Sequence, residues 1–493
     1  LLRENPAFIP LLFIALAIIA FAIATLAKFV PMIRGSGIPQ TEGAARGLLE
    51  LNWYKSLPSM AAACLVCIIS GLTAGAEGPS MFIGATCGDG VSKMLRCTDM
   101  ERRYQLTGGA SAGLAVAFNA PLTGIVFAFE EAHRRFTPAI FICAFSSVLS
   151  SIITRNLLFE LMHMEVTSTF TTVTLVQMPL KTYGYVAIAA IISGLLGFGF
   201  YSLCLLSRKI FAKITFAKGL GKMLIPFVAA GVFGLISVSV MGGGHSFIQS
   251  LGTLGGMREQ SIAAIFSSPV VVSLLLVLVM RIVATVFNLG AGVPCGIFIP
   301  MLSIGACVGA LVSKLCGAIG MDAVYGDCIV MICMATFFAS IVKAPITAIV
   351  MIVELTWQFT LLVPIILGVS FGYMVSEIFG AKPIYEVILD GILEDEHVHL
   401  TRHSYTTTIE EGSIAMNKPI RDVLWPGNLL IRSIKRGDEI VVASSDTVLR
   451  AGDEITVQTE CVDFDRFKVW VDEIVKPRKR FALRTSRKTT KRN

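Results

Sequence analysis

Residues 75–93 read GAEGPSMFIGATCGDGVSK, and residues 296–314 read GIFIPMLSIGACVGALVSK. At an offset of 221, Pro79, Ile83, Gly84, Ala85, Gly88, Val91, Ser92 and Lys93 match Pro300, Ile304, Gly305, Ala306, Gly309, Val312, Ser313 and Lys314. At an offset of 224, Ala120, Pro121, Thr123, Ile125, Val126 and Glu130 match Ala344, Pro345, Thr347, Ile349, Val350 and Glu354. Because both sets keep their order and nearly their spacing, the chain is predicted to contain two homologous halves, at about 1–161 and 180–392. The pattern does not indicate whether the repeat is parallel or inverted.

Glu77 is the most informative residue of the first stretch. It follows an uncharged run from Ser56 to Ala76, and an acid in or near a bilayer is costly unless it has a function. The Gly78-Pro79 pair is expected to start a new helix and to direct free backbone N–H groups at the space around Glu77. Repeated segments interrupted by Gly and Pro indicate a transport site at the repeat interface. We therefore interpret Glu77 as a gate for anions.

The composition is that of a membrane protein. Hydrophobic residues make up 54% of the 493, charged residues 15%, and mean hydropathy is +0.74. Each of several uncharged runs is about as long as a helix needs to cross a bilayer. These runs are Ala7–Ala27, Tyr104–Phe129, Tyr183–Ser207, Met223–Gly244, Ile282–Ser313 and Leu355–Ser376. The sequence therefore predicts a polytopic α-helical membrane protein.

The net charge of +7 comes from one end of the chain. Residues 476–493 contain nine Lys and Arg and no acid, which leaves the remaining chain at −2. This tail is interpreted either as a disordered cytosolic segment that touches anionic lipid or as a solvated end. Further basic clusters at 93–103, 133–135 and 208–222 are predicted to be cytoplasmic by the positive-inside rule.

The twelve cysteines show no regular framework. Cys64 and Cys67 could form a redox or metal pair, but their place in an uninterrupted apolar run favours core packing. The apolar region offers no set of metal ligands and no nucleophile with a nearby base. We therefore expect no metal, no cofactor and no enzymatic activity there.

Four motifs occur in a fixed order along the chain. They are Gly35-Ser36-Gly37-Ile38-Pro39, the Glu77 segment, Gly296-Ile297-Phe298-Ile299-Pro300 and Lys382-Pro383-Ile384-Tyr385. In this order, and with Gly113-Leu114-Ala115 through Glu130-Glu131 between them, the chain resembles the CLC family of chloride channels and proton-coupled chloride transporters over about residues 5–392. The resemblance implies an all-α polytopic membrane domain with two inverted repeats, a homodimer with one pore per subunit, and cytosolic termini, in a bacterial plasma membrane. It also implies a further membrane helix before the segment that starts near Pro6.

The resemblance also implies a chloride site. Ser36 and Tyr385 would present hydroxyls to the ion, and the backbone amides of Ile297 and Phe298 would complete the site. Helix N-termini suit this task because they offer N–H groups and partial positive charge without trapping the anion. Singly, Ser36 could be a helix cap, Tyr385 an interfacial anchor and the glycines packing points. The resemblance also implies that the selectivity motifs around the site contain Gly35, Gly37, Pro39, Gly78, Pro79, Gly296 and Pro300. A serine at position 36 favours chloride, with bromide and nitrate as permeant analogues.

Two glutamates have roles implied by the resemblance. Glu77 would be the gating glutamate, and Glu131 would pass protons to it from the cytoplasmic side, as in the transporter branch. Alternatively, Glu131 belongs to a helix end paired with His133-Arg134-Arg135. Ala76 departs from the family, which usually has Arg or Lys before the gating glutamate, and this leaves room for a passive, pH-gated chloride channel. A membrane-embedded enzyme, or a transporter of another solute, is the third hypothesis.

Residues 393–475 are predicted to form a separate soluble unit. The cluster from Glu394 to His399 could bind a metal but is interpreted as an exposed linker. Strand-like segments follow at 429–434, 439–443 and 454–458, with turn signals between them. From Gly412 to Glu454 the chain resembles the C-terminal ligand-binding domain of potassium-transport regulators, the RCK or TrkA-C type. This resemblance implies a small cytosolic α/β module that binds a small molecule such as a cyclic dinucleotide, or that only stabilises a dimer. No nucleic-acid partner is expected.

Overall fold

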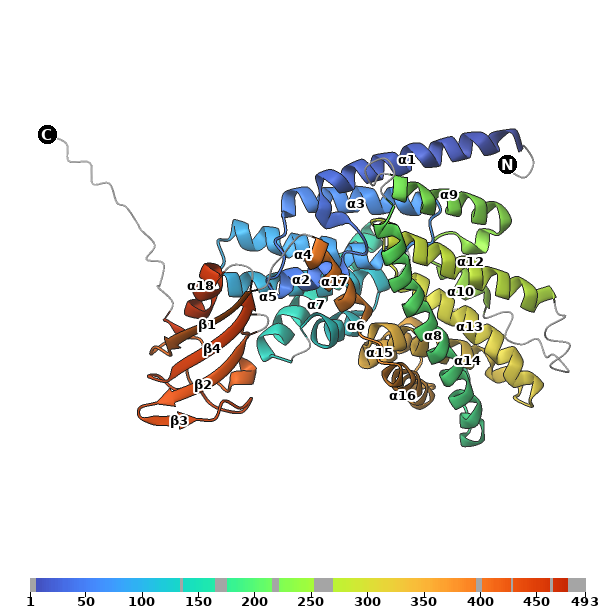
Figure 1. Ribbon diagram of the computed structural model, residues 1–493. Helices are drawn as coiled ribbons and strands as arrows, with labels where there is room; N and C mark the ends of the chain where they lie inside the picture. Colours follow the sequence, from blue (N-terminus) through green and yellow to red (C-terminus); the bar gives the residue numbers. More distant parts are fainter. Residues whose placement is uncertain are drawn as a thin grey trace. The chain divides into compact units, whose positions relative to one another are not determined.

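The computed structural model describes residues 6–133, 136–164, 175–214, 221–251, 269–395, 401–426, 429–461 and 464–477. The chain is divided into two compact units, one helical and the other built around a sheet (Figure 1). The predictions made for the basic tail and for most of the acidic linker concern residues outside these ranges.

The first unit is built from helices. The described helices are α1 (Ile9–Phe29), α2 (Ile38–Ala45), α3 (Trp53–Ile69), α4 (Glu77–Met94), α5 (Asp99–Phe118), α6 (Pro121–Phe127), α7 (Pro138–Leu161), α8 (Tyr183–Ala212), α9 (Gly221–Ile236), α10 (His245–Leu251), α12 (Pro269–Ala291), α13 (Phe298–Ala318), α14 (Gly326–Val342), α15 (Pro345–Thr356), α16 (Leu362–Ile378) and α17 (Ile384–Asp395).

Several uncharged runs hold more than one helix. The run 104–129 is divided between α5 and α6, and the run 282–313 between α12 and α13. The first break follows from Asn119, whose φ is +54°, and from Pro121, which fits the first turn of a helix but not its interior. The length of an uncharged run therefore does not show where a helix ends within these two runs.

Six helical segments among the described residues are long and apolar enough to cross a membrane. They comprise α1, α7, α8 with the short turn before it, α12, α13 and α14 with its preceding turn. In the most apolar stretch of α13, and in that of α14, 89% of the residues are buried within the protein. The corresponding share is 22% for α1 and 17% for α7. The pair α13 and α14 thus forms the centre of the unit, and α1 and α7 lie at its periphery. This arrangement confirms a polytopic α-helical membrane protein.

The repeated glycines perform the same task in both halves. A Cβ atom on Gly84 of α4 would lie 2.1 Å from the carbonyl oxygen of Gly109 in α5. A Cβ atom on Gly309 of α13 would lie 2.6 Å from the Cα of Val330 in α14. In each half, glycine therefore lets a motif-bearing helix cross the following helix at backbone contact.

Each half also supplies a glutamate that caps a helix of the other half. Glu354 at the end of α15 accepts hydrogen bonds from the amides of Leu122 and Thr123 in α6, both at 2.7 Å. Glu130, its equivalent, accepts from the amides of Ile346 and Thr347 in α15, at 2.8 and 2.6 Å. A carboxylate satisfies free amides and the positive end of the helix dipole. This reciprocity is what a two-fold relation between the repeats requires.

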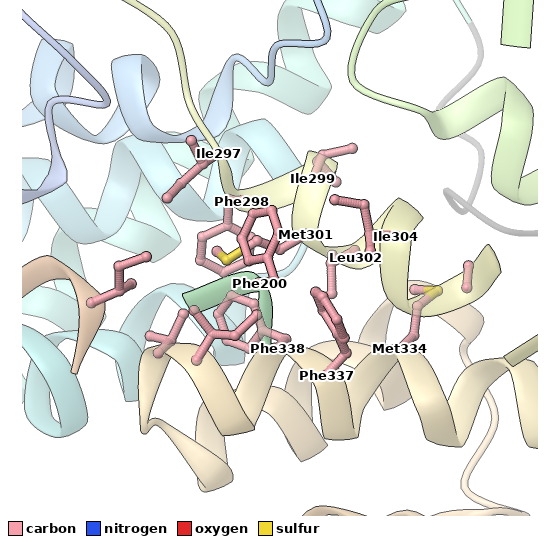
Figure 2. Packing of buried hydrophobic residues seen from close by; sticks show 14 of the residues in the cluster. Phe200, Ile297, Phe298, Ile299, Met301, Leu302, Ile304, Met334, Phe337 and Phe338 are labelled. Carbon is pink, nitrogen blue, oxygen red and sulfur yellow. The ribbon is translucent and has the colours of Figure 1, made fainter. Parts of the chain in front are cut away.

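An aromatic cluster fixes the start of α13. The ring of Phe298 lies 4.9 Å from that of Phe118 in α5 and 4.4 Å from that of Phe338 in α14, measured between centroids. Phe200 of α8 packs on Phe337 in the same core (Figure 2). Burial of these rings supplies a large hydrophobic free energy and leaves the first turn of α13 little freedom.

The second unit is an antiparallel sheet with one described α-helix and a short 3-10 turn at Ile420–Asp422. Its strands are β1 (Thr401–Thr408), β2 (Leu430–Arg436), β3 (Glu439–Val441) and β4 (Glu454–Cys461), in the order β1-β4-β2-β3. Helix α18 (Phe464–Val475) packs on β1, where the hydroxyl of Tyr405 donates to Asp472 at 2.9 Å. The predicted segments correspond to β2, β3 and β4. Strand β1 escaped the sequence analysis because its residues are mostly polar and hydroxyl-bearing.

Candidate functional site

Glu77 is the first residue of α4, and its carboxylate is buried. The residue is 3% exposed, and its Oε2 atom has no hydrogen-bond partner among the described residues. A Cβ atom on Gly75 would lie 2.1 Å from that oxygen, so the side chain folds back over the glycine backbone. The helix starts at Glu77, one residue before the Gly78-Pro79 pair that was expected to start it. The carboxylate therefore belongs to the helix end with its free amides.

The two repeats meet beside this carboxylate. Gly75 and Gly296 form an antiparallel bridge, with N–H···O distances of 2.8 and 2.7 Å. A Cβ atom on Gly296 would lie 2.9 Å from the carbonyl oxygen of Gly75, so neither position accommodates a side chain easily. The bridge leads into Ile297, the residue before α13, and Phe298, its first residue. Both are buried, and the free amides of this helix end lie next to those of α4.

The motif of residues 35–39 lies close to the bridge between Gly75 and Gly296. A Cβ atom on Gly78 would lie 2.4 Å from the carbonyl oxygen of Ser36 and 3.4 Å from the Cα of Gly296. Gly37 precedes α2 with φ at +82°, a conformation that glycine adopts readily. Gly35 donates its N–H to the carbonyl of Gly292 at 3.1 Å. The structure therefore brings three of the sequence motifs together at the starts of α2, α4 and α13, where Pro39, Pro79 and Pro300 each lie in the first turn.

Two hydroxyls at this site lack partners within the described residues. Ser36 is 3% exposed and Tyr385, near the start of α17, is fully buried; neither hydroxyl has a hydrogen-bond partner. Buried hydroxyls normally have partners, so such groups suggest an ion or water between them. Tyr385 also lies within electrostatic range of both Glu77 and Glu131. These two hydroxyls fit the role of donors to an anion.

Glu131 lies in a π-helical turn, Ala128–Ala132, that follows α6. Such turns are rare and are frequent at functional sites. Glu131 is 1% exposed, whereas its neighbour Glu130 serves as the cap of α15. The alternative interpretation, a helix end paired with its own basic residues, involves Arg134 and Arg135, which lie outside the described residues.

The sequence analysis missed one residue at the site. Nε2 of His245, the first residue of α10, lies 3.7 Å from Oε1 of Glu77. The run Gly242-Gly243-Gly244 just before it was a signal, because consecutive glycines often mark close backbone approach. Histidine is also rare in this chain, with 6 in 493 residues.

Cys64 and Cys67 are buried free thiols on α3. Cys64 lies within electrostatic range of Glu77. No cluster of three or more metal-ligating side chains occurs in the part of the chain that the structure describes.

Comparison with known families decides the assignment. The model of the voltage-gated chloride channel family matches residues 16–377. The chain belongs to this family. The TrkA-C domain model matches residues 406–469, which include most of the sheet of the second unit.

Curated members of the voltage-gated chloride channel family are similar over most of their length. The H(+)/Cl(-) exchange transporter ClcA of Vibrio cholerae is 31% identical over 410 residues, covering 80% of this chain and 82% of the relative. The H(+)/Cl(-) exchange transporter ClcA of Cronobacter sakazakii is 31% identical over 374 residues, covering 73% and 75%.

Solved structures agree on the fold. A slow cyanobacterial Cl-/H+ antiporter superposes with a TM-score of 0.67 at 26% identity, covering 80% of this chain and 92% of that one. A eukaryotic CLC transporter superposes with a TM-score of 0.61 at 20% identity, covering 84% and 71%. The described helices thus form the CLC membrane fold with two inverted repeats, and the second unit is a small TrkA-C-like module.

Proposed function

We propose that this protein is a proton-coupled chloride transporter that exchanges H+ for Cl−. One observation carries the proposal: a buried carboxylate, that of Glu77, occupies the helix end where the two repeats join. An ionised carboxylate there competes with a chloride ion for the same amides. A protonated carboxyl loses that attraction and leaves room for the ion. Proton binding and anion binding are then mutually dependent.

The anion site in this proposal lies among three helix starts. Ser36 and Tyr385 donate hydroxyls, and Ile297 and Phe298 donate backbone amides. None of these groups carries a full charge, so they replace the hydration shell of chloride without holding it too tightly. The unpartnered hydroxyls of Ser36 and Tyr385 support this assignment. The transported ions, chloride and protons, are the only small ligands that the membrane domain needs.

The proton path in this proposal runs from Glu131 to Glu77. Burial of Glu131 and the position of Tyr385 within range of both glutamates support a route past the chloride site. The curated relatives are named H(+)/Cl(-) exchange transporters, which supports exchange over passive flow. A passive pH-gated channel is the competing function, since Ala76 supplies no charge next to the gate.

Purified protein in liposomes tests the proposal. A chloride gradient is imposed, valinomycin and K+ set the membrane potential, and the pH outside is recorded. Exchange predicts uphill proton movement that stops when the chloride gradient is removed. Chloride flux without coupled proton movement would identify a channel and remove the assigned role of Glu131.

We further propose a homodimer in a bacterial plasma membrane with the second unit in the cytosol. The basic clusters that follow α4 and α8 support a cytosolic side by the positive-inside rule. The second unit is proposed to bind a cytosolic small molecule such as a cyclic dinucleotide. Deletion of residues 401–493 tests this: flux that responds to a nucleotide in the full chain and not in the truncated one supports regulation. Equal flux in both, with every nucleotide tested, supports a stabilising appendage.

A further inference from the structure

His245 lies within ion-pair distance of the Glu77 carboxylate. The two side chains lie 3.7 Å apart, and they differ sharply in access to solvent. The side chain of His245 is 42% exposed, against 4% for that of Glu77. The imidazole therefore lies between a buried carboxylate and the exterior of the protein.

The backbone before His245 is fixed to the backbone before Glu77. The hydroxyl of Thr73 donates to the carbonyl of Val240 at 2.7 Å, and the amide of Gly242 donates to the carbonyl of Leu72 at 3.1 Å. Asn288 of α12 donates to the carbonyl of Thr73 at 2.8 Å. These bonds join the segments 239–244 and 72–76, so the fold fixes the backbone positions from which His245 and Glu77 approach each other.

Arg281 strengthens this frame from α12. Its guanidinium is fully buried, donates twice to the carbonyl of Ser239 at 2.9 and 2.6 Å, and donates to the hydroxyl of Ser303 in α13 at 2.8 Å. It also lies over the ring of Phe247 in α10, with 4.7 Å to the centroid. A buried cation bound in this way fixes the start of α10, and therefore the position of His245.

Three further titratable groups lie within electrostatic range of Glu77. They are Cys64 on α3, Cys295 just before α13 and Tyr385 on α17. Thiols and phenols carry no charge in the acidic range in which histidine titrates. Arg281 is occupied by the Ser239 carbonyl, and residue 76 is alanine. Among these groups, only His245 combines a direct contact with a side chain that can carry a positive charge.

We propose that His245 is a positioning residue for the gate: its protonated imidazole holds the Glu77 carboxylate in the closed position, and its deprotonation weakens that hold. This rests on the proposed exchange function and adds a second titrating group to it. Coulomb attraction at this distance is substantial even when partly screened by water. The pH dependence of transport would thus reflect the charges of both side chains.

Substitutions that fix the charge at residue 245 test this in liposomes. Chloride efflux and proton uptake are measured while the outside pH is varied between about 4.5 and 8.5, the range that brackets histidine. His245→Gln removes the cation, so proton binding at Glu77 becomes easier and the midpoint of the flux profile shifts to higher pH, by about one unit. His245→Lys keeps a cation at all these pH values and shifts the midpoint to lower pH.

The Glu77→Gln background provides the decisive control. In this background the carboxyl is neutralised, so His245 has lost its interaction partner. Chloride flux and its pH profile should then be the same with His245→Gln as with His245→Lys. A purely structural role would lower flux in both backgrounds without opposite shifts of the midpoint. Equal midpoints for the wild type, His245→Gln and His245→Lys, or shifts that persist in the Glu77→Gln background, would overturn the proposal.

The experiment also separates this inference from the proposed function. If the wild type shows no coupled proton movement, the exchange function fails, while the midpoints of chloride flux still report on His245. Size-exclusion profiles verify that the variants are folded, and His245→Asn serves as a second neutral variant. Should His245→Gln misassemble, the same shift to higher pH is required of His245→Asn.

Discussion

The starts of α4 and α13 are equivalent positions in the two repeats, and they differ in one decisive residue. At the offset of 221, Glu77 corresponds to Phe298. Both are the first residue of their helix, both follow a glycine of the same bridge, and both are buried. The carboxylate of Glu77 has an unpartnered oxygen, whereas the Phe298 ring packs among aromatic side chains.

This difference shows how a symmetric scaffold acquires an asymmetric function. Each half provides a helix end with free amides, which attracts an anion. In the second half an aromatic ring is anchored in the core and leaves the amides available. In the first half an acidic side chain can occupy the anion position itself and can be neutralised by a proton. In the proposed mechanism the scaffold binds the anion, and Glu77, which replaces the phenylalanine of the other half, couples that binding to protons.

Glu77→Gln should have the largest effect because it makes the two helix starts electrically alike. We expect coupled proton flux to disappear and chloride flux to persist, since an amide side chain does not titrate. Proteoliposome recordings of both ions check this, with Glu160→Gln, an exposed glutamate on α7, as the matched control. Retained proton movement in Glu77→Gln would refute the gating role.

Glu131→Ala should separate proton supply from the gate. Proton flux is expected to fall by at least about tenfold while chloride flux remains, because the buried carboxyl that passes protons is gone. The adjacent Glu130→Gln change is the natural comparison, since Glu130 caps α15 and is expected to leave the ratio of protons to chloride unchanged. Parallel loss of both fluxes in Glu131→Ala would assign a structural role to Glu131.

The reciprocal caps permit a test of the symmetry itself. Glu130→Gln and Glu354→Gln each replace a charged cap, and each should lower the free energy of unfolding by about 1–2 kcal/mol. The two losses should be nearly equal because the four cap amide distances all lie between 2.6 and 2.8 Å. Thermal unfolding in detergent measures them, with the exposed Glu411→Gln as control. Clearly unequal losses would mean that the caps are equivalent in geometry only.

A carboxylate in the second unit offers the smallest but clearest contrast with Glu77. Asp453 is also buried, but it accepts two hydrogen bonds from Arg436, at 2.7 and 2.8 Å, and one from the amide of Arg450 at 2.8 Å. Burial alone would raise the pKa of Asp453, but these hydrogen bonds outweigh it and hold the pKa below its ordinary value.

The depressed pKa of Asp453 makes the second unit sensitive to acid. Since the folded pKa lies below the unfolded one, the carboxylate stabilises the fold above about pH 4, and this is lost as the pH falls through the folded pKa. Asp453→Asn should lower stability at neutral pH by about 2 kcal/mol and flatten its acid dependence. Hydrogen exchange of β2 and β4 amides in the full chain reports this. The exposed pair of Asp446 with Arg421 gives the control, because Asp446→Asn should change little.

Much of the architecture could be read from local patterns. Long apolar runs predict helices because, in lipid, backbone N–H and C=O groups must form hydrogen bonds with each other. The repeated glycines mark the positions where helices cross. The helix breaks inside the runs were missed since hydropathy alone does not show them, although Asn119 and Pro121 do. Strand β1 was missed because its partners, and not its own polar residues, determine its pairing.

The sequence by itself determined the membrane class, the two repeats and the family resemblance, and it identified Glu77 as the candidate gate, because these depend on composition, order and spacing. Only the tertiary structure decided which groups share the site. The bridge between Gly75 and Gly296, the exchanged caps of Glu130 and Glu354, and the contact of His245 with Glu77 join residues more than 160 positions apart. Such contacts arise from the packing of the two halves against each other, and no local pattern in a single chain specifies them.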